Sequence, residues 1–210
     1  MREEVEKRIV VMIDETNDPG SRVHGNHYII GATVVDRDNI RAFARITKSY
    51  ASGHEMKFYE DVKERELVLD KISKLNVRLY AETIEKPIFP NWNDKEQLNV
   101  HRTAVFRLME RIVKEENADR TLIIIDENNK AKPPRLKEMG RMIAEKHGKN
   151  IIVVVKRSKM SFHLQTNDFN LGGMNKKYNH DDNSYIERTG AEIKHEALTF
   201  ERRKSARKND

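Results

Sequence analysis

Short runs of valine and isoleucine recur along the chain, each about as long as a buried strand. Apolar runs of this length, bounded by polar segments, are typical of strands inside a sheet. Turn residues separate the first two runs, at Asp18-Pro19-Gly20 and His24-Gly25-Asn26, and predict an antiparallel hairpin. The predicted strands cover about residues 8–14, 27–35, 77–84, 120–126 and 150–155.

Apolar residues at helical spacing fill the intervals between these strands. Pro133 and Pro134 start the fourth predicted helix, and Gly148 ends it. Ser161 is placed to cap a fifth helix, which carries Leu164. The stripes of the first four helices are Ala42, Phe43 and Ile46; Val68, Ile72 and Leu75; Leu98, Val105, Leu108, Met109, Ile112 and Val113; and Leu136, Met139 and Ile143.

The predicted order is therefore hairpin, helical insertion, strand, helix, strand, helix, strand, helix. Strands that first pair as neighbours and then alternate with helices imply a mixed α/β sheet, here of about five strands, with helices on its faces. We expect one such domain over residues 1–175 of the 210-residue chain. Residues 176–210 are expected to form a polar loop, a charged helix from Tyr185 to Arg207, and a basic tail.

Charge and composition narrow the choice of partner. Charged residues make up 35% of the chain and the formal net charge is +6, which suits a polyanion such as nucleic acid. The surplus gathers in the tail, which predicts either phosphate contacts or a solvated, disordered end. The predicted nucleic-acid contacts are Arg202, Arg203, Lys204, Arg207 and Lys208.

Two absences exclude whole classes of protein. The chain has no cysteine, which excludes disulfides, thiolate zinc sites and cysteine nucleophiles. It has no stretch long and apolar enough to cross a bilayer, and no apolar segment of the kind a secretory signal needs. We therefore expect a cytoplasmic protein without a membrane partner.

Four acidic residues lie at the edges of apolar runs. Asp14 and Asp126 directly end predicted strands, whereas Glu55 and Asp168 come a short way after theirs. A strand that ends in a carboxylate delivers it to the rim of the sheet, and burying a lone carboxylate is costly, so packing explains these positions poorly. The alternative is a turn or cap residue. Brought together, the four carboxylates would form an oxygen cage suited to Mg²⁺ or Mn²⁺.

Three further residues accompany these acids. Lys57 is two positions after Glu55, so on an extended segment both point the same way, as a functional pair or as a surface ion pair. Gln165 is three positions before Asp168, so both share one face of a helix. Glu15 alternates to the face opposite Asp14 and has a supporting place at most.

In their order, these motifs resemble the domain-of-unknown-function 3800 family, over about residues 8 to 175. The resemblance implies a ribonuclease-H-like fold and a nuclease or related nucleic-acid-processing activity. It points to Asp14, Glu55, Asp126 and Asp168 as site residues, with Lys57 and Gln165 in support. The matching strings are Ile13-Asp14-Glu15-Thr16, Glu55-Met56-Lys57-Phe58, Ile125-Asp126-Glu127 and Leu164-Gln165-Thr166-Asn167-Asp168-Phe169.

The leading hypothesis is a metal-dependent nuclease. Asp14 and Asp126 would hold two Mg²⁺ or Mn²⁺ ions, which in such sites lie about 3.5–4 Å apart. Glu55 and Asp168 would complete the ligand shells, and Lys57 would orient water or stabilise developing negative charge.

Three other hypotheses stay open. A restriction-endonuclease-like site would use Asp14 with Glu55 and Lys57, and it requires Asp14 and Glu55 on adjacent strands. A nucleic-acid-binding or partner-binding protein would keep the fold without turnover, and binding would then depend steeply on salt. A structural subunit of a larger assembly is the third. The choice of DNA or RNA and the oligomeric state do not follow from the sequence.

Overall fold

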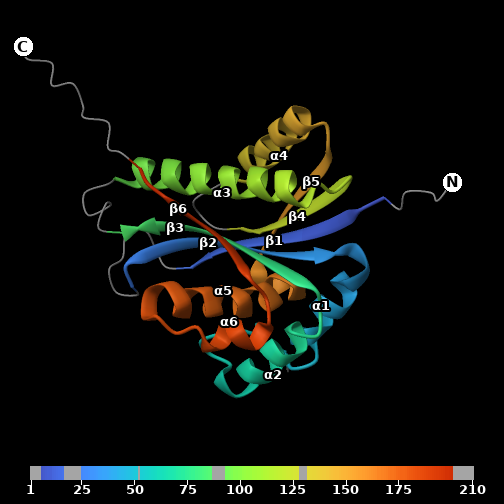
Figure 1. Cartoon of the computed structure of the whole chain (residues 1–210), viewed down its shortest axis with the longest axis vertical. Helices are drawn as coiled ribbons and strands as arrows, with labels where there is room; N and C mark the ends of the chain where they lie inside the picture. Colours follow the sequence, from blue (N-terminus) through green and yellow to red (C-terminus); the bar gives the residue numbers. More distant parts are fainter. Residues whose placement is uncertain (1–5, 17–24, 52, 87–92, 128–131, 201–210) are drawn as a thin grey trace, which may run out of the picture.

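The computed structural model describes residues 6–16, 25–51, 53–86, 93–127 and 132–200. In this part of the chain, six strands form one sheet with helices on both faces (Figure 1). All five predicted strands and the five helices predicted before residue 185 are present, in the predicted order. The strands are β1 (Arg8–Thr16), β2 (His27–Asp36), β3 (Val77–Glu85), β4 (Arg120–Asp126), β5 (Asn150–Lys156) and β6 (Ile193–Leu198). The helices are α1 (Ile40–Lys48), α2 (Val62–Ile72), α3 (Asp94–Glu116), α4 (Pro133–His147), α5 (Phe162–His180) and α6 (Ser184–Thr189), with short 3-10 turns η1 (Arg37–Asn39) and η3 (Ser158–Met160).

The sheet is mixed, with strand order β5-β4-β1-β2-β3-β6. β1 pairs antiparallel with β2, which confirms the predicted hairpin, and β2 pairs antiparallel with β3. β4 is parallel to β1, β5 to β4, and β6 to β3. The expected fold class, an α/β mixed sheet flanked by helices, is confirmed, and the sheet is one strand wider than expected.

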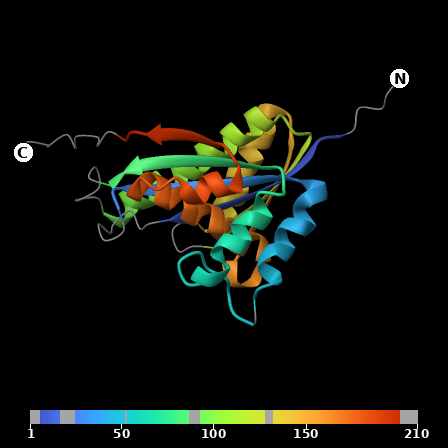
Figure 2. The same cartoon turned by 60° about the horizontal axis from the view of Figure 1, so that its bottom comes forward.

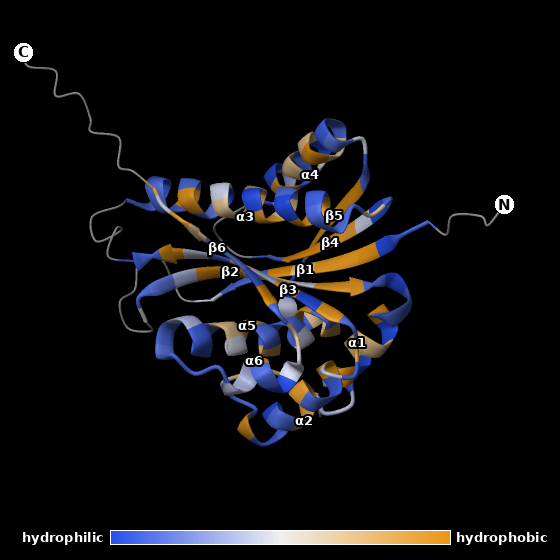
Figure 3. Ribbon diagram, in the orientation of Figure 1, coloured by the Kyte–Doolittle hydropathy of each residue, from blue (hydrophilic) through white to orange (hydrophobic). Residues whose placement is uncertain are grey.

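Alternation along the strands separates two apolar cores. On β1, Ile9, Val11 and Ile13 face the core formed with α3 and α4. Val10 and Met12 face the other core, which α1, α2 and α5 complete. Figure 2 shows the two helical layers on opposite sides of the sheet, and Figure 3 shows the apolar stripe of α3 turned towards the strands. The sheet is covered on both faces because period-2 strands alternate their side chains between two helical layers.

Local signals set the ends of two helices. The side chain of Asn93 accepts a hydrogen bond from the Glu96 N–H, and the Glu96 side chain accepts one from the Asn93 N–H, so a capping box starts α3. Pro133 and Pro134 start α4, and Gly148 ends it with a left-handed φ of 62°. Both predicted limits of α4 are confirmed.

The prediction for the segment after residue 175 is wrong in its described part. α5 continues through the expected polar loop to His180, because the side chains of Asn175 and Asn179 find hydrogen-bond partners on Tyr59 and His27. In place of one charged helix from Tyr185 to Arg207, the chain forms the six-residue α6 and then β6, which pairs with β3 and belongs to the sheet. The basic tail residues Arg202, Arg203, Lys204, Arg207 and Lys208 lie outside the described residues.

None of the helices in the described ranges has the length and apolar character that crossing a membrane requires.

Candidate functional site

Asp14 and Asp126 lie side by side at the carboxyl ends of two inner strands, β1 and β4. We call this end of the sheet the carboxylate edge. β1 and β4 are parallel neighbours, and Ile13 is paired in register with Ile125, so the next residue on each strand is an aspartate at the same level. Alternation places both side chains on the face of the sheet that carries Met12. That is the face covered by α5. The carboxyl ends of parallel strands therefore bring together two acids that are far apart in the sequence.

Helix α5 supplies Asp168 and Gln165 to the same edge. The helix approaches the sheet closely, because β2 offers Gly31 directly opposite Asp14. A Cβ atom at Gly31 would lie 2.6 Å from Leu171 Cδ1, which is closer than real side chains come. The absence of a side chain at this position thus allows α5 to pack against β1 and β2.

The segment from Glu55 to Phe58 is fixed onto α5 by two backbone hydrogen bonds. The Phe58 N–H donates to Asp168 Oδ2 at 2.7 Å, and the Met56 N–H donates to Gln165 Oε1 at 3.2 Å. The Phe58 ring lies over Gly172, where a Cβ atom would come within 2.1 Å of it. Gln165 and Asp168, three residues apart, therefore both hold the same segment in place.

Glu55 and Lys57 form an ion pair beside these aspartates. Lys57 Nζ is 2.8 Å from Glu55 Oε1, so the predicted shared face of the two residues is confirmed. Both lie in the irregular segment before α2, not on a strand. The restriction-endonuclease-like hypothesis required Asp14 and Glu55 on adjacent strands, and the structure does not meet that requirement.

Ser158 is a site residue that the sequence analysis missed. Its N–H donates to Asp126 Oδ1 at 2.8 Å, and its carbonyl accepts from Gln165 Nε2 at 3.3 Å. Lys57 Nζ donates to its hydroxyl at 3.4 Å. One serine in the turn after β5 thus joins β4, α5 and the segment that holds Lys57. The only sequence signal is its place just after a strand, which many serines share.

Burial and mutual repulsion shift the acids toward their protonated forms. Asp14 is 8% exposed, and burial raises its pKa well above the usual value, as do the charges of Glu15, Asp126 and Asp168. Burial also raises the pKa of Asp126 and of Asp168, although a backbone N–H opposes the shift in each case. Negative charge on Asp14, Asp126 and Asp168 is therefore unfavourable in the surroundings that the fold provides.

Lys57 is the cation that partly compensates this cluster. Burial acts to lower its pKa, but the hydrogen bond to Glu55 and the charges of Asp168, Glu55 and Asp14 outweigh it and raise the pKa. Burial likewise acts to raise the pKa of Glu55, and hydrogen bonds from Lys57 and Ser158 reverse the effect and lower it. At neutral pH the pair is accordingly an ammonium beside an ionised carboxylate.

The donor set suits a divalent cation in its chemistry. Asp14, Asp126 and Asp168 each have one oxygen fixed by a backbone N–H, from Glu15, Ser158 and Phe58. An ionised carboxylate has about four lone-pair sites, so one such bond leaves room for a cation on each. All the ligands are hard oxygens, which Mg²⁺ and Mn²⁺ prefer. As the side chains stand, no three acids or histidines of the described ranges are close enough together to hold one ion.

The structure thus brings six of the predicted site residues to one edge: Asp14, Glu55, Lys57, Asp126, Gln165 and Asp168. Glu15 continues β1 on the opposite face, as expected, and acts on Asp14 through its charge and its backbone N–H.

Comparisons with known proteins leave the family open. No family model matches the chain, and no curated protein matches it. Among solved structures, a chain from the PCNA–RNase HII complex of Archaeoglobus fulgidus is similar, with a TM-score of 0.47 and 12% identity, over 87% of this chain and 75% of that one. A likeness at this level carries no argument about the site or its chemistry.

Proposed function

We propose that this chain is a divalent-metal-dependent nuclease, or a related phosphodiester-processing enzyme, acting on DNA or RNA. The proposal rests mainly on one observation. The Asp14 side chain is buried, it lies next to Asp126 on the neighbouring parallel strand, and the charge of Asp168 on α5 also acts on it. Burying several carboxylates together is unfavourable, so a fold that does so without matching cations has a use for the charge. Attraction of a divalent cation is the use that these ligands fit.

Membership of the domain-of-unknown-function 3800 family belongs to the same proposal. Its support is that the four motifs that carry the resemblance, which are spread between residues 13 and 169, contribute neighbouring side chains. A cytoplasmic location, expected from the absence of cysteine, is kept with it.

Each site residue would have a separate role. Asp14, Asp126, Asp168 and Glu55 would hold one or two Mg²⁺ or Mn²⁺ ions. When bound, such ions polarise phosphoryl oxygens and lower the pKa of water. Burial and the neighbouring acids raise the pKa of Asp14, and a bound cation would favour the ionised form of this side chain.

Lys57 and Ser158 have roles other than metal binding. The Lys57 ammonium stays charged at neutral pH, so it can donate a hydrogen bond to a phosphoryl oxygen as negative charge develops there. Ser158 positions Asp126 with its N–H and Lys57 with its hydroxyl. The acids thus attract the cation, and the lysine stabilises the transferred group.

The test is cleavage of labelled single-stranded and duplex DNA and RNA in Mn²⁺, in Mg²⁺ and in EDTA. We expect cleavage in metal and none in EDTA. Asp14→Asn and Asp126→Asn should each lose at least about 100-fold in rate, because even residues that only support metal ligands cost 10–100-fold. Asp94→Asn, the same chemical change on the exposed first turn of α3, should cleave like the unchanged chain.

Two results would contradict the proposal. Metal-dependent cleavage that survives both Asp14→Asn and Asp126→Asn would place the chemistry elsewhere. Salt-dependent binding of every nucleic acid in the panel, with no cleavage of any, would favour the non-catalytic binding protein.

A further inference from the structure

A groove of about 400 Å³ lies on the α5 face of β1, β4 and β5, and it extends from Arg8 and Arg120 at the start of these strands to Lys156, which pairs in register with Asp126. Its wall includes four basic side chains, and its floor is aliphatic. The residues that matter to the argument are Arg8, Arg37, Arg120, Lys156, Leu122 and Ile152.

The groove is open because the helices cover the two halves of the sheet unequally. α5 packs over β1 and β2 and makes few contacts with β4. α4 covers the other face of β5, where Gly140 lies against Val153. On the α5 face, Ile152 is 58% exposed. This side chain leaves aliphatic surface of β5 uncovered on the floor of the groove.

The floor of the groove leads directly to the acids. Arg120, Leu122, Ile124 and Asp126 alternate onto one face of β4, so the strand carries a cation at one end and a site carboxylate at the other. Six residues of strand span ~20 Å. A polymer lying along β4 would therefore reach Asp126 and its neighbours.

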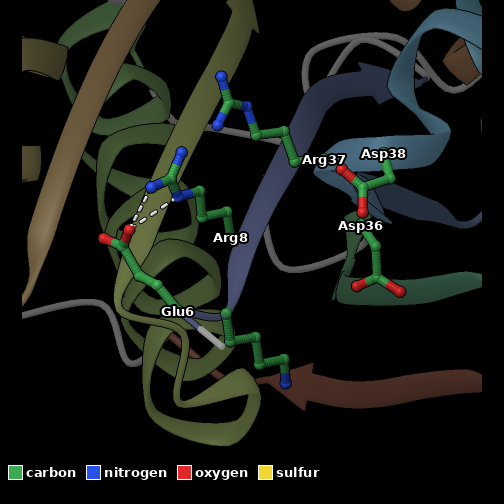
Figure 4. A pocket seen from close by; sticks show the side chains of 6 residues that line it. Glu6, Arg8, Asp36, Arg37 and Asp38 are labelled. Atoms are coloured by element: carbon green, nitrogen blue, oxygen red, sulfur yellow. Dashed lines mark hydrogen bonds and ion pairs between the residues drawn. The ribbon is translucent and has the colours of Figure 1, made fainter. Parts of the chain in front are cut away.

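The cations of the groove are only partly neutralised. Arg8 and Arg120 share Glu6, with Arg8 Nε 2.8 Å and Arg120 Nε 2.5 Å from its carboxylate. Arg37 and Lys156 form no ion pair with any residue of the described ranges. Figure 4 shows Arg8 joined to Glu6, while Arg37 extends away from both, at the border with an adjoining pocket of about 500 Å³.

Besides Glu6, two acids line that adjoining pocket, Asp36 and Asp38. Asp36 is engaged by Arg78 at 2.8 Å, and Asp38 lies beside it in η1. His163 completes the wall from α5, and burial together with the charge of Lys156 lowers its pKa, so it adds no positive charge at neutral pH. The groove itself thus presents four cations with one carboxylate, Glu6, among them.

We infer that this groove binds a single strand of nucleic acid and directs it to the carboxylate edge. Phosphates would lie on Arg8, Arg37, Arg120 and Lys156, and base faces on the aliphatic floor. A single strand fits better than a duplex, because only unpaired bases have faces free for apolar side chains. The inference rests on the proposed function for the chemistry at the end of the path, and the binding itself is independent of it.

The experiment measures the binding of a labelled single-stranded oligonucleotide by fluorescence anisotropy in EDTA, where no cleavage can interfere. The double variant Arg37→Glu with Lys156→Glu should weaken binding at least about 10-fold, and it should lower the slope of log K against log salt by about 1.4, for two lost phosphate contacts on a single strand. Ile152→Gln should weaken binding by a smaller factor and leave the slope unchanged.

The matched control reverses the same number of charges elsewhere. Lys95→Glu with Lys137→Glu changes two exposed lysines on α3 and α4, and it should leave binding within about 2-fold. Equal losses in both double variants would overturn the inference, because the effect would then be one of net charge. So would binding of an acidic polypeptide, such as polyglutamate, in place of the oligonucleotide, or a dimer that only the groove variant dissociates.

The two proposals fail separately. Asp14→Asn should abolish cleavage and keep binding in EDTA. Binding that depends on the groove residues, without any cleavage, would support the groove and contradict the nuclease proposal. Cleavage and binding that the groove variants leave unchanged would support the nuclease proposal and contradict the groove.

Discussion

Two groups of buried acids lie on opposite faces of the same sheet, and they differ in how their charge is balanced. On the α3 face, Glu116 accepts hydrogen bonds from Arg78 Nε at 2.9 Å and Tyr80 Oη at 2.8 Å, and Lys7 Nζ lies 3.4 Å from it. Glu82 lies 3.0 Å from Arg111. On the α5 face, four carboxylates share Lys57.

The difference separates a structural network from a candidate site. Glu116 and Glu82 each have an arginine within ion-pair distance, although Arg111 is shared with Glu196, so removing one partner harms the fold. The acids of the α5 face outnumber the cations beside them, and backbone N–H groups fix the orientation of their side chains. Burial alone is common to both groups, so an uncompensated charge with fixed ligand geometry is the better indicator of function.

The largest expected effect separates the two groups by activity. Asp168→Asn should lower the rate of metal-dependent cleavage by at least about 100-fold with little change in the folded fraction. Glu116→Gln should do the opposite, because it leaves Arg78 and Lys7 without a buried partner and lowers the free energy of unfolding by about 3 kcal/mol. The measurements are cleavage rate per folded molecule and urea unfolding. Full cleavage by the Asp168 variant would remove the distinction.

A second prediction concerns metal and stability. Because the α5-face acids repel one another, the free energy of unfolding at pH 8 should rise on addition of Mn²⁺, by about 2.7 kcal/mol at 100 times the dissociation constant, and fall again in EDTA. Asp14→Asn should raise the stability of the metal-free chain and reduce its response to Mn²⁺, since the variant removes both the repulsion and a ligand. Thermal unfolding with and without metal measures both effects. An unchanged response in Asp14→Asn would place the metal elsewhere.

Most of the fold, and most of the residues at the carboxylate edge, could be predicted from the sequence. Valine- and isoleucine-rich runs identify the central strands of the sheet, and an acid that ends such a run is conspicuous. Asp14 and Asp126 were therefore predictable, and their parallel strands place them level.

β6 and the end of α5 were not predictable by the same reasoning. β6 carries Lys194, His195 and Glu196 and has only one fully buried side chain, Leu198, so its period is invisible in the hydropathy pattern. The end of α5 is helical because polar residues such as Asn175 and Asn179 bind partners distant in the sequence. Ser158 was missed for a related reason, since its contacts with Asp126 and Gln165 use backbone atoms, which any residue offers.

A third prediction concerns Glu82 of the α3 face and the dependence of folding stability on pH. Burial raises the pKa of Glu82 to about 7, from the ordinary 4.5, despite the opposing charge of Arg111. The folded chain therefore keeps this proton to higher pH than the unfolded chain, so the stability contributed by Glu82 falls as pH rises from about 4.5 to about 7 and is level above. Glu82→Gln should flatten the melting temperature over that range. The same slope in both proteins would contradict the assignment.

The smallest expected effect belongs to Ser158. Ser158→Ala removes the hydroxyl that contacts Lys57 and keeps the N–H that holds Asp126, so cleavage should fall by only about 10-fold, at the low end for residues that support a site. Ser158→Pro removes the N–H as well and should cost more. Single-turnover rates of the two variants compare the contributions, and equal rates would show that the bond to Asp126 is dispensable.

The most direct test of the account is the crystal structure of the protein soaked in Mn²⁺, with the ion located by its anomalous signal. The account predicts density between β1 and β4, with carboxylate oxygens of Asp14 and Asp126 at about 2.1 Å from an ion. Density elsewhere, or an empty carboxylate edge at saturating Mn²⁺, would contradict it.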